Sequence, residues 1–526
     1  MDYREEKFEV CDDAKINRRL YFGDHFLDGK GLMTRPTEDR EIIRQRKDSF
    51  VFENIIKEVV DRKRDGVLGR EPNWRIVRKD GEELSDADNV LISEFTSAAI
   101  SWWNERKLLE TEKKLIVDAL LARKSYLRPF SPVGMRDEKG NVKAQETLSS
   151  ALDLLHFENV STESASVRCD EMTLKPYSTY KYIRAGQSFT DFSFVDADGV
   201  THFKTFTDVG YIEFAQNELP TIAKYIAEET GDKTTSEHRM ILGGKLHLFE
   251  MDLGEAFITA AIRSLQKKHN LDLTMEGRNS YTAGFRERHF LGADAPETLA
   301  IGAGAASYTQ GVPIYDNDGK IIGTTSPSLT VIEPVDPKTF HQSQLSNYAK
   351  ILSQAEQKHV VMNDAATVSG ISRAEARAEF RTSLLNIKQP TDASIRYIIE
   401  FAMSFAAALT NRTEAFAAFR VDADCVVSAG IPSPEEKEAN RKSYEAGEID
   451  IETLRVLNGT DDADAMAAKI KAAPDYELNY TLDVFEKAQT AVPVDLIVEL
   501  LPFDEATKTR IRKYIPKVEE EAAVGV

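Results

Sequence analysis

The central part of the sequence contains two helical patterns of apolar residues. Across residues 338–358, apolar or aromatic side chains recur three or four positions apart, and Pro337 precedes them, where its missing N–H costs little. Across residues 371–410 a longer pattern continues beyond Pro390. Because proline removes one backbone hydrogen bond and crowds the preceding turn, the sequence predicts two helices, the second kinked or broken at Pro390.

A polar segment separates these two helices. Residues 359–370 contain an Asn-Asp pair and a Ser-Gly pair, both common in turns. Ser372 and Glu375 follow with the three-residue spacing of a capping box, which predicts that the second helix begins near Ser372. The segment 359–370 is therefore expected to be a loop between two long helices.

A small β-rich insert is expected immediately before this region. Residues 253–283 again show helical periodicity, and residues 286–334 change to Gly, Ala, Thr and Pro with short apolar runs. Asp318-Gly319 lies between two such runs, which is a hairpin signal. An insert joined at both ends to long helices must project from their common tip.

The remaining sequence mixes helical and strand patterns, so the predicted fold class is α+β. Trp102 and Trp103 are expected in the core, because large aromatic side chains usually serve packing. The expected helices span residues 37–64, 91–121, 145–155, 219–229 and 435–471, and the expected strands lie within residues 74–77, 159–213, 244–249 and 416–428.

Composition and charge limit the functional classes. The chain has 526 residues, of which 42% are hydrophobic and 29% charged, and no apolar run is long enough for a transmembrane helix. Its three cysteines lie far apart and are expected to be reduced. The formal net charge of −20 argues against a surface that grips nucleic acid, although a protein can surround DNA without holding it.

No residue pattern nominates a catalytic, metal or cofactor site. Residues 302–311 are rich in glycine but lack the lysine of a phosphate-binding loop, so a close-packed loop is preferred over a nucleotide site. His247 alternates with apolar residues and is interpreted as a strand residue rather than a ligand. His359 is equally interpretable as a cation at the end of the first central helix. We therefore expect no enzymatic activity and no cofactor.

Four stretches in this order resemble bacteriophage portal proteins, the rings at the head–tail vertex. They correspond to an opening helix and turn, a β-segment of the wing, the loop and long helix facing the channel, and the start of the C-terminal region. The stretches are residues 56–72 (IKEVVDRKRDGVLGREP), 167–180 (VRCDEMTLKPYSTY), 363–384 (NDAATVSGISRAEARAEFRTSL) and 446–458 (AGEIDIETLRVLN). The N-terminal arm has no counterpart that can be placed.

The resemblance implies a portal-protein fold, with an α/β wing, a two-helix stem, a small β-rich clip, a long kinked helix and an α-helical crown. The implied boundaries, in chain order, are an arm at 1–38, the first part of the wing at 39–250, a stem helix at 251–285, the clip at 286–335, a stem helix at 336–358, a tunnel loop at 359–370, the kinked helix with the second part of the wing at 371–434, and the crown and tail at 435–526.

The resemblance also implies a function and partners. Portal proteins form dodecameric rings at the unique capsid vertex, through which double-stranded DNA is packaged and later ejected. They contact the major capsid protein, the terminase large subunit and the head–tail adaptor, and they carry no ATPase and no cofactor. The chain would be made in the host cytoplasm, would become part of the virion, and would not enter a membrane.

The residues that would lie along the DNA channel are those of the tunnel loop and its flanks, with the kink at Pro390. They are Lys358, His359, Asn363, Ala366, Thr367, Arg373 and Arg377. An acidic ring would repel the duplex and keep it centred, while a few basic residues would limit that repulsion. Alternatively, the net charge only keeps a large protein soluble, and Lys358, Arg373 and Arg377 pair with carboxylates at positions 356, 375 and 379.

Two other functions stay open at this point. A different structural protein of the head–tail junction, such as an adaptor, would also suit long helices with an insert, although this chain is long for one. An enzyme that uses the glycine-rich residues 302–311 for a nucleotide is the other alternative.

Overall fold

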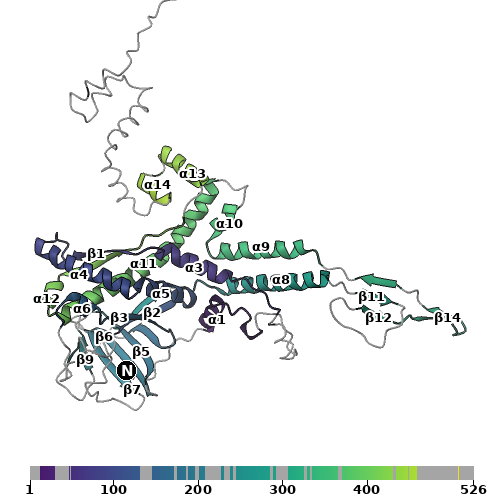
Figure 1. Ribbon diagram of the computed structural model, residues 1–526, viewed down its shortest axis with the longest axis horizontal. Coiled ribbons are helices and arrows are strands. Elements are labelled where there is room, and N and C mark those ends of the chain that lie inside the picture. The colour runs from purple at the N-terminus through teal and green to yellow at the C-terminus, as the bar shows by residue number, and fades with distance from the viewer. Residues whose placement is uncertain are drawn as a thin grey trace, which may run out of the picture. The chain divides into compact units, whose positions relative to one another are not determined.

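The computed structural model shows a mixed α+β protein whose contacts divide it into two compact units, residues 1–436 and 437–526 (Figure 1). The structure describes residues 12–29, 47, 49–130, 145–170, 175–184, 187–195, 201–207, 227–229, 237–240, 245–284, 288–291, 306–324, 328–331, 335–364, 370–430, 434–447, 449, 451–458 and 508.

The core of the first unit is built around α3 (Ile55–Leu68), α5 (Leu108–Ala122) and α11 (Gly370–Leu409). The Asn54 side chain caps α3 by accepting a hydrogen bond from the Lys57 backbone N–H. The apolar side chains that α3 presents to α5 and α11 are fully buried, and each contributes about 1.5–3 kcal/mol of transfer free energy. These three helices, far apart in sequence, therefore hold the unit together.

The helix expected over residues 91–121 is two helices, α4 (Asp86–Glu105) and α5. The chain turns at Lys107, whose φ of 51° is left-handed, and this local conformation left no sign in the apolar pattern. Both tryptophans are buried, as predicted. Trp102 donates its indole N–H to the Leu155 carbonyl at 3.0 Å, so its polar atom is also satisfied.

Two sheets of this unit are formed by strands that lie far apart in the sequence. The predicted strands near residues 74–77 and 416–428 are observed as β1 (Asn73–Arg78) and β16 (Phe419–Asp424), which pair antiparallel. A three-stranded sheet has the order β10-β2-β3, with β2 at Lys124–Phe130, β3 at His156–Val160 and β10 at Phe249–Asp252.

The β-rich block is a six-stranded antiparallel sheet of order β4-β5-β6-β7-β9-β8. Its strands are β4 (Ala165–Cys169), β5 (Pro176–Arg184), β6 (Gln187–Val195), β7 (Thr201–Thr207), β8 (Ala227–Glu229) and β9 (Glu237–Met240). The expectation of a helix at 219–229 is wrong at its end, because residues 227–229 are strand; residues 219–226 lie outside the described chain. Short helical elements complete the unit: α1 (Asp12–Tyr21), η2 (Leu27–Gly29), α6 (Leu148–Leu152) and α12 (Thr413–Phe416).

Two long helices, α8 (Ala260–Gly284) and α9 (Pro337–Gln354), pack side by side and carry the insert at their far end (Figure 1). The insert contains the sheet β12-β11-β15 and the hairpin β13-β14. Gly319, with a φ of 75°, makes the predicted hairpin turn. The strands are β11 (Arg288–Leu291), β12 (Ala306–Thr309), β13 (Pro313–Tyr315), β14 (Ile321–Thr324) and β15 (Ser328–Val331).

Several helix boundaries differ from the sequence-based expectation. The helix expected from residue 253 begins at Ala260, because the preceding residues form a connection whose backbone donates to α5 at Leu120. The helix expected over residues 37–64 is not continuous, since residues 50–54 are not helical and α3 begins at Ile55, whereas its expected start at Thr37 lies outside the described residues. Pro337 does stand at the first turn of α9, where Asp336 caps the helix.

The region between α9 and α11 differs most from its prediction. Part of the expected loop is a short helix, α10 (Lys358–Asp364). α11 begins at Gly370, so Ser372 lies within the helix instead of capping it. The helix also continues through Pro390 without a break, in contrast to one of the two predicted outcomes.

The second unit is described over two helices, α13 (Pro434–Glu445), which begins at the boundary, and α14 (Ile451–Leu457). Gly447, with a φ of 76°, follows α13, so the helical region expected from residue 435 is interrupted here. The Asn440 side chain donates to Asn458 Oδ1 at 3.0 Å and joins the two segments.

One close approach in the first unit gives a direct test of its packing. A Cβ at Gly66 would lie 2.7 Å from Leu384 Cδ1 and 3.2 Å from the Ser428 carbonyl oxygen. We expect Gly66→Ala to lower the free energy of unfolding by about 1–3 kcal/mol. Gly277→Ala is the matched control, because a Cβ there meets nothing within 4 Å in the interior of α8 and should stabilise by roughly 0.5–1 kcal/mol. Urea unfolding of both variants measures these changes. An unchanged free energy of unfolding for Gly66→Ala would contradict the close packing of Gly66 against Leu384.

Candidate functional site

The residues expected along a channel are distributed over α10 and the first half of α11. Lys358 is partly exposed, and its Nζ lies 3.3 Å from Glu379 Oε1. This is the ion pair that the alternative interpretation of Lys358 anticipated, at a surface position where such pairs contribute about 0–1 kcal/mol. Asn363 lies in α10, whereas Ala366 and Thr367 lie outside the described residues.

Three of the expected channel residues are covered by their own chain. His359 is buried, and its ring packs against the Phe380 ring with 4.6 Å between centroids and an angle of 33° between the ring planes. Arg373 and Arg377 are also buried, and Arg377 donates to the Ala429 carbonyl at 2.5 Å. The arrangement places these three side chains against the body of the subunit, which is at odds with an exposed channel role for them.

The exposed face of α11 was not singled out by the sequence analysis. Over the first half of the helix it carries two carboxylates and otherwise neutral or apolar side chains, namely Glu375, Ala378, Glu379, Thr382, Leu385, Asn386 and Gln389, and the exposed Arg396 follows in the second half. Their spacing of three and four residues places them on one side of the helix. None of these seven side chains is basic, so this face is poorly suited to binding phosphate groups tightly.

Side-chain bonds hold the turns around Pro390. Thr391 donates its hydroxyl to the Ile387 carbonyl at 2.8 Å, and Lys388 pairs with Asp392 at 2.7 Å. Asp392 in turn accepts from the Cys425 backbone N–H at 2.7 Å, just after β16. These contacts tie the proline turn to the neighbouring strand, which accounts for a helix that continues past proline.

Pro390→Ala tests whether this proline contributes to assembly or DNA packaging through the shape of the helix. Alanine restores one backbone N–H and removes the ring, so we expect local helix stability to be unchanged or higher. If the proline sets a bend that assembly needs, assembly or DNA packaging should nevertheless fall. Thermal unfolding and a packaging assay check both parts; a fully active variant would show that the proline is dispensable.

Polar contacts set the register of the α8–α9 pair. Asp272 Oδ2 accepts from the Ser343 hydroxyl at 2.6 Å and from the Asn347 amide at 2.9 Å. Nearer the insert, Asn279 bonds both the carbonyl and the N–H of Val335, at 2.7 and 2.8 Å. Such charge-assisted and paired hydrogen bonds fix the position of α8 relative to α9 along the helix axes. They therefore also fix the position of the insert.

An ion pair between a buried lysine and an exposed glutamate anchors the opposite end of α9. Lys63 on α3 reaches Glu356 at 2.7 Å, and the surrounding burial lowers the pKa of Lys63. The next residue, Gln357, donates its side chain to the Val59 carbonyl at 2.7 Å. Glu356 has a left-handed φ of 59°, so the chain turns sharply here between α9 and α10 while remaining attached to α3.

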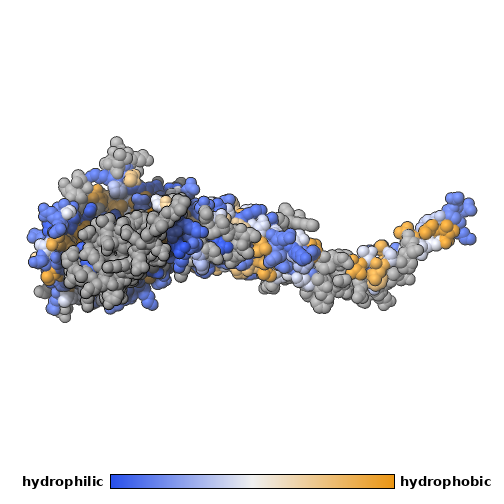
Figure 2. Space-filling model, turned by 90° about the horizontal axis from the view of Figure 1, so that it is seen from above, coloured by the Kyte–Doolittle hydropathy of each residue, from blue (hydrophilic) through white to orange (hydrophobic). Residues whose placement is uncertain are grey.

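The insert exposes an unusual number of apolar side chains (Figure 2). Val312 is 64% and Ile322 66% exposed, and Ile314, Tyr315, Ile321 and Leu329 are exposed as well. No described residue of the insert belongs to the main core cluster. Contiguous exposed apolar surface of this kind usually marks a site of contact with another molecule.

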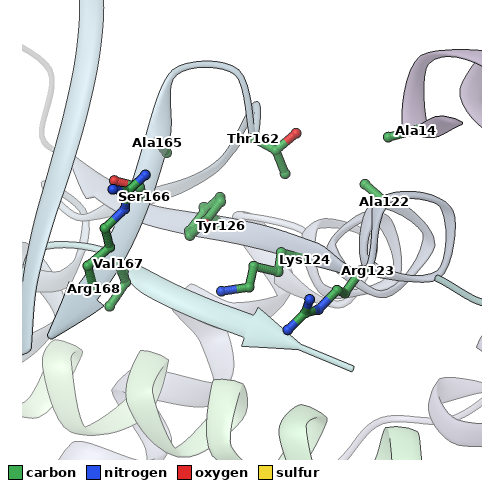
Figure 3. A pocket seen from close by; sticks show the side chains of 10 residues that line it. All are labelled: Ala14, Ala122, Arg123, Lys124, Tyr126, Thr162, Ala165, Ser166, Val167 and Arg168. Carbon is green, nitrogen blue, oxygen red and sulfur yellow. The ribbon is translucent and has the colours of Figure 1, made fainter. Parts of the chain in front are cut away.

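The cavity in Figure 3 offers little for catalysis. It measures about 220 Å³ and lies between the end of α5, β2 and β4. Two of the three cations that line it are paired with carboxylates: Lys124 lies 3.1 Å from Glu250, and Arg123 lies 3.2 Å from Asp252. Tyr126 donates to the same Glu250 at 2.9 Å. The site therefore has no free cation at Arg123 or Lys124 with which to hold an anion.

Other chemical candidates from the sequence find no support in the described residues. The described end of the glycine-rich segment is β12, not the turn and helix start of a phosphate loop. His247 is buried just before β10, and burial lowers its pKa to about 3. In the described part of the chain, no three His, Cys, Asp or Glu side chains converge as metal ligands, and no helix has the length and apolarity to cross a membrane.

Models of known protein families give no match to this chain, and curated proteins give none either.

Proposed function

We propose that this chain is the subunit of a phage portal ring, through which double-stranded DNA enters and leaves a capsid. The observation that carries the proposal is the order α8, insert, α9, α10 and α11. Two packed helices present a small β-rich insert with apolar surface, and a short connection leads back into one helix of 40 residues. In this assignment they are the stem, the clip, the tunnel segment and the kinked helix.

The remaining elements are assigned to the wing and the crown of the proposed portal. The sheets and helices up to β10, together with β16, form the wing, and the second unit forms the crown. The apolar surface of the insert is the docking surface for the terminase large subunit and then for the head–tail adaptor. The wing and crown contact the major capsid protein, and the assembled ring belongs to the virion.

The charge of the chain suits a channel that lets DNA slide. The exposed face of the first half of α11, over residues 375–389, contributes two carboxylates and no basic side chain, and the chain as a whole carries −20. Tight binding of a duplex requires several Lys or Arg contacts to phosphates. In the proposed ring, DNA is confined by geometry and repelled evenly from the wall, so it is not held at any one point.

A binding experiment tests this proposal on the purified full-length protein. We expect weak binding of a linear duplex in a filter or anisotropy assay, with the affinity falling further as salt rises from about 50 to 200 mM. Tight binding that salt does not change would contradict the sliding channel. ATP hydrolysis by the protein alone would favour an enzyme instead, because the proposed ring leaves hydrolysis to the terminase.

A further inference from the structure

The first half of α11 carries opposite charges on different sides. Arg373, Arg377 and Arg381 follow one another at four-residue spacing and therefore form one row along the helix. Glu375 and Glu379 form a second row, two positions out of phase, which is about 200° away around a helix with 3.6 residues per turn. A helix charged in this way is complementary to a second copy of itself laid alongside.

Arg381 is the member of the basic row that has no partner among the described residues of its own chain. No described side chain or backbone group forms an ion pair or hydrogen bond with it, whereas Arg377 donates to the Ala429 carbonyl. Arg381 is only partly exposed, and burial alone lowers its pKa. A guanidinium that is partly desolvated and unpaired is destabilising unless an anion reaches it from elsewhere.

The acidic row contains a matching group. Glu379 pairs with Lys358, but Glu375 is exposed and forms no ion pair with any described residue. The unpaired cation and the unpaired anion are six residues apart and on different sides of one helix, so they cannot meet within a single α11. They can meet between two copies whose helices lie side by side.

Ring symmetry makes that arrangement possible. In a cyclic assembly each copy meets the next through two different surfaces, so one side of a helix faces a different side of its neighbour. A second copy is also a better occupant than DNA, because the exposed face of α11 that would meet a duplex is the side with Glu375 and Glu379. Arg381 lies at the edge of the buried side.

We propose that Arg381 of one copy pairs with Glu375 of the next, so that a closed circle of ion pairs joins the α11 helices. This inference rests on the proposed ring. It assigns the contact that locks neighbouring α11 helices together, and it makes the charges of this helix part of assembly.

A charge swap tests the pairing in the full-length protein. Arg381→Glu and Glu375→Arg should each raise the protein concentration at which half of the chains are in rings by about tenfold or more, because like charges then face each other. The double variant, with both substitutions, should recover most of the loss. Ring fraction is measured by native mass spectrometry across a dilution series, at low and at raised salt.

Two controls separate assembly from folding. Arg381→Met keeps much of the aliphatic part of the arginine side chain. This variant should fold with an unchanged circular dichroism spectrum and should still weaken the rings. Arg396→Glu makes the same charge change at an exposed position of the same helix and should leave assembly unaffected. If wild-type rings form and Arg381→Glu assembles equally well, or if the double variant recovers nothing, the pairing is wrong. If the wild-type protein forms no ring, the proposed function itself fails.

Discussion

Replacing residues 288–331 with a short Gly-Ser linker is expected to leave a folded protein that can no longer support DNA packaging. Arg288 and Val331 are direct neighbours in the insert sheet, so the linker has to span only one gap between strands, about 5 Å. The contact of Asn279 with Val335 lies outside the deletion and holds together the end of the α8–α9 pair that carries the insert. Because the insert adds nothing to the main core, the unfolding temperature should change little.

The expected loss is one of docking. In the proposed portal the apolar surface of the insert binds the terminase and later the adaptor, and removing it eliminates that contact entirely. Pull-down of terminase and an in vitro packaging assay measure the effect. Val312→Ser with Ile322→Ser is the milder companion, since it keeps both strands of the hairpin but removes the two most exposed apolar side chains among the described residues of the insert. Normal terminase binding by the deletion variant would move the docking surface elsewhere.

Glu112→Gln is expected to stabilise the protein at pH 8 and to have little effect near pH 4. Glu112 lies fully buried on α5, where one oxygen accepts from the Ser394 hydroxyl at 2.8 Å and the other has no partner. Burial raises the pKa of Glu112 to about 8. Glutamine has a similar shape, can still accept from Ser394, and carries no charge at any pH.

The direction of the change in folding stability with pH depends on whether the folded or the unfolded state keeps the proton on Glu112. In the unfolded chain the carboxyl loses its proton near its usual pKa of about 4.3, whereas in the folded protein it keeps the proton up to about pH 8. Folding stability should therefore fall as pH rises through that window, by a few kcal/mol at about 1.4 kcal/mol per unit of pKa difference. Thermal unfolding from pH 4 to 8 measures it.

Glu110→Gln provides the matched control on the same helix, because Glu110 is exposed and pairs only weakly with Lys113. It should unfold like the wild type at every pH. If the Glu112→Gln protein shows the same decline in stability with pH as the wild type, then Glu112 is not the group responsible.

The elements that local patterns define were predictable from the sequence. Gly319 makes a turn that few residues other than glycine adopt easily, and Pro337 takes a position that suits its missing N–H, so both left clear signals. The succession of long helix, β-rich insert and long helix followed from changes in periodicity. These features depend on near neighbours in the chain.

The errors concern features that depend on distant contacts. The resemblance implied an exposed position for His359, but the side chain is buried beside the Phe380 ring, and no periodicity reveals which distant residue will cover a side chain. A break at Pro390 was one of two predicted outcomes, and it is absent because Asp392 is held by Cys425, which follows β16 later in the chain. The exposed face of α11 was missed for the same reason, since exposure becomes visible only once the buried side of a helix is known.

Electron micrographs of the purified protein, averaged down the symmetry axis, show whether this chain forms a ring. We expect closed rings of about a dozen identical copies around an opening wide enough for a B-form duplex, as heterologous contacts with cyclic closure would produce. A monomer, a two-fold dimer or an open filament as the main species would contradict this expectation.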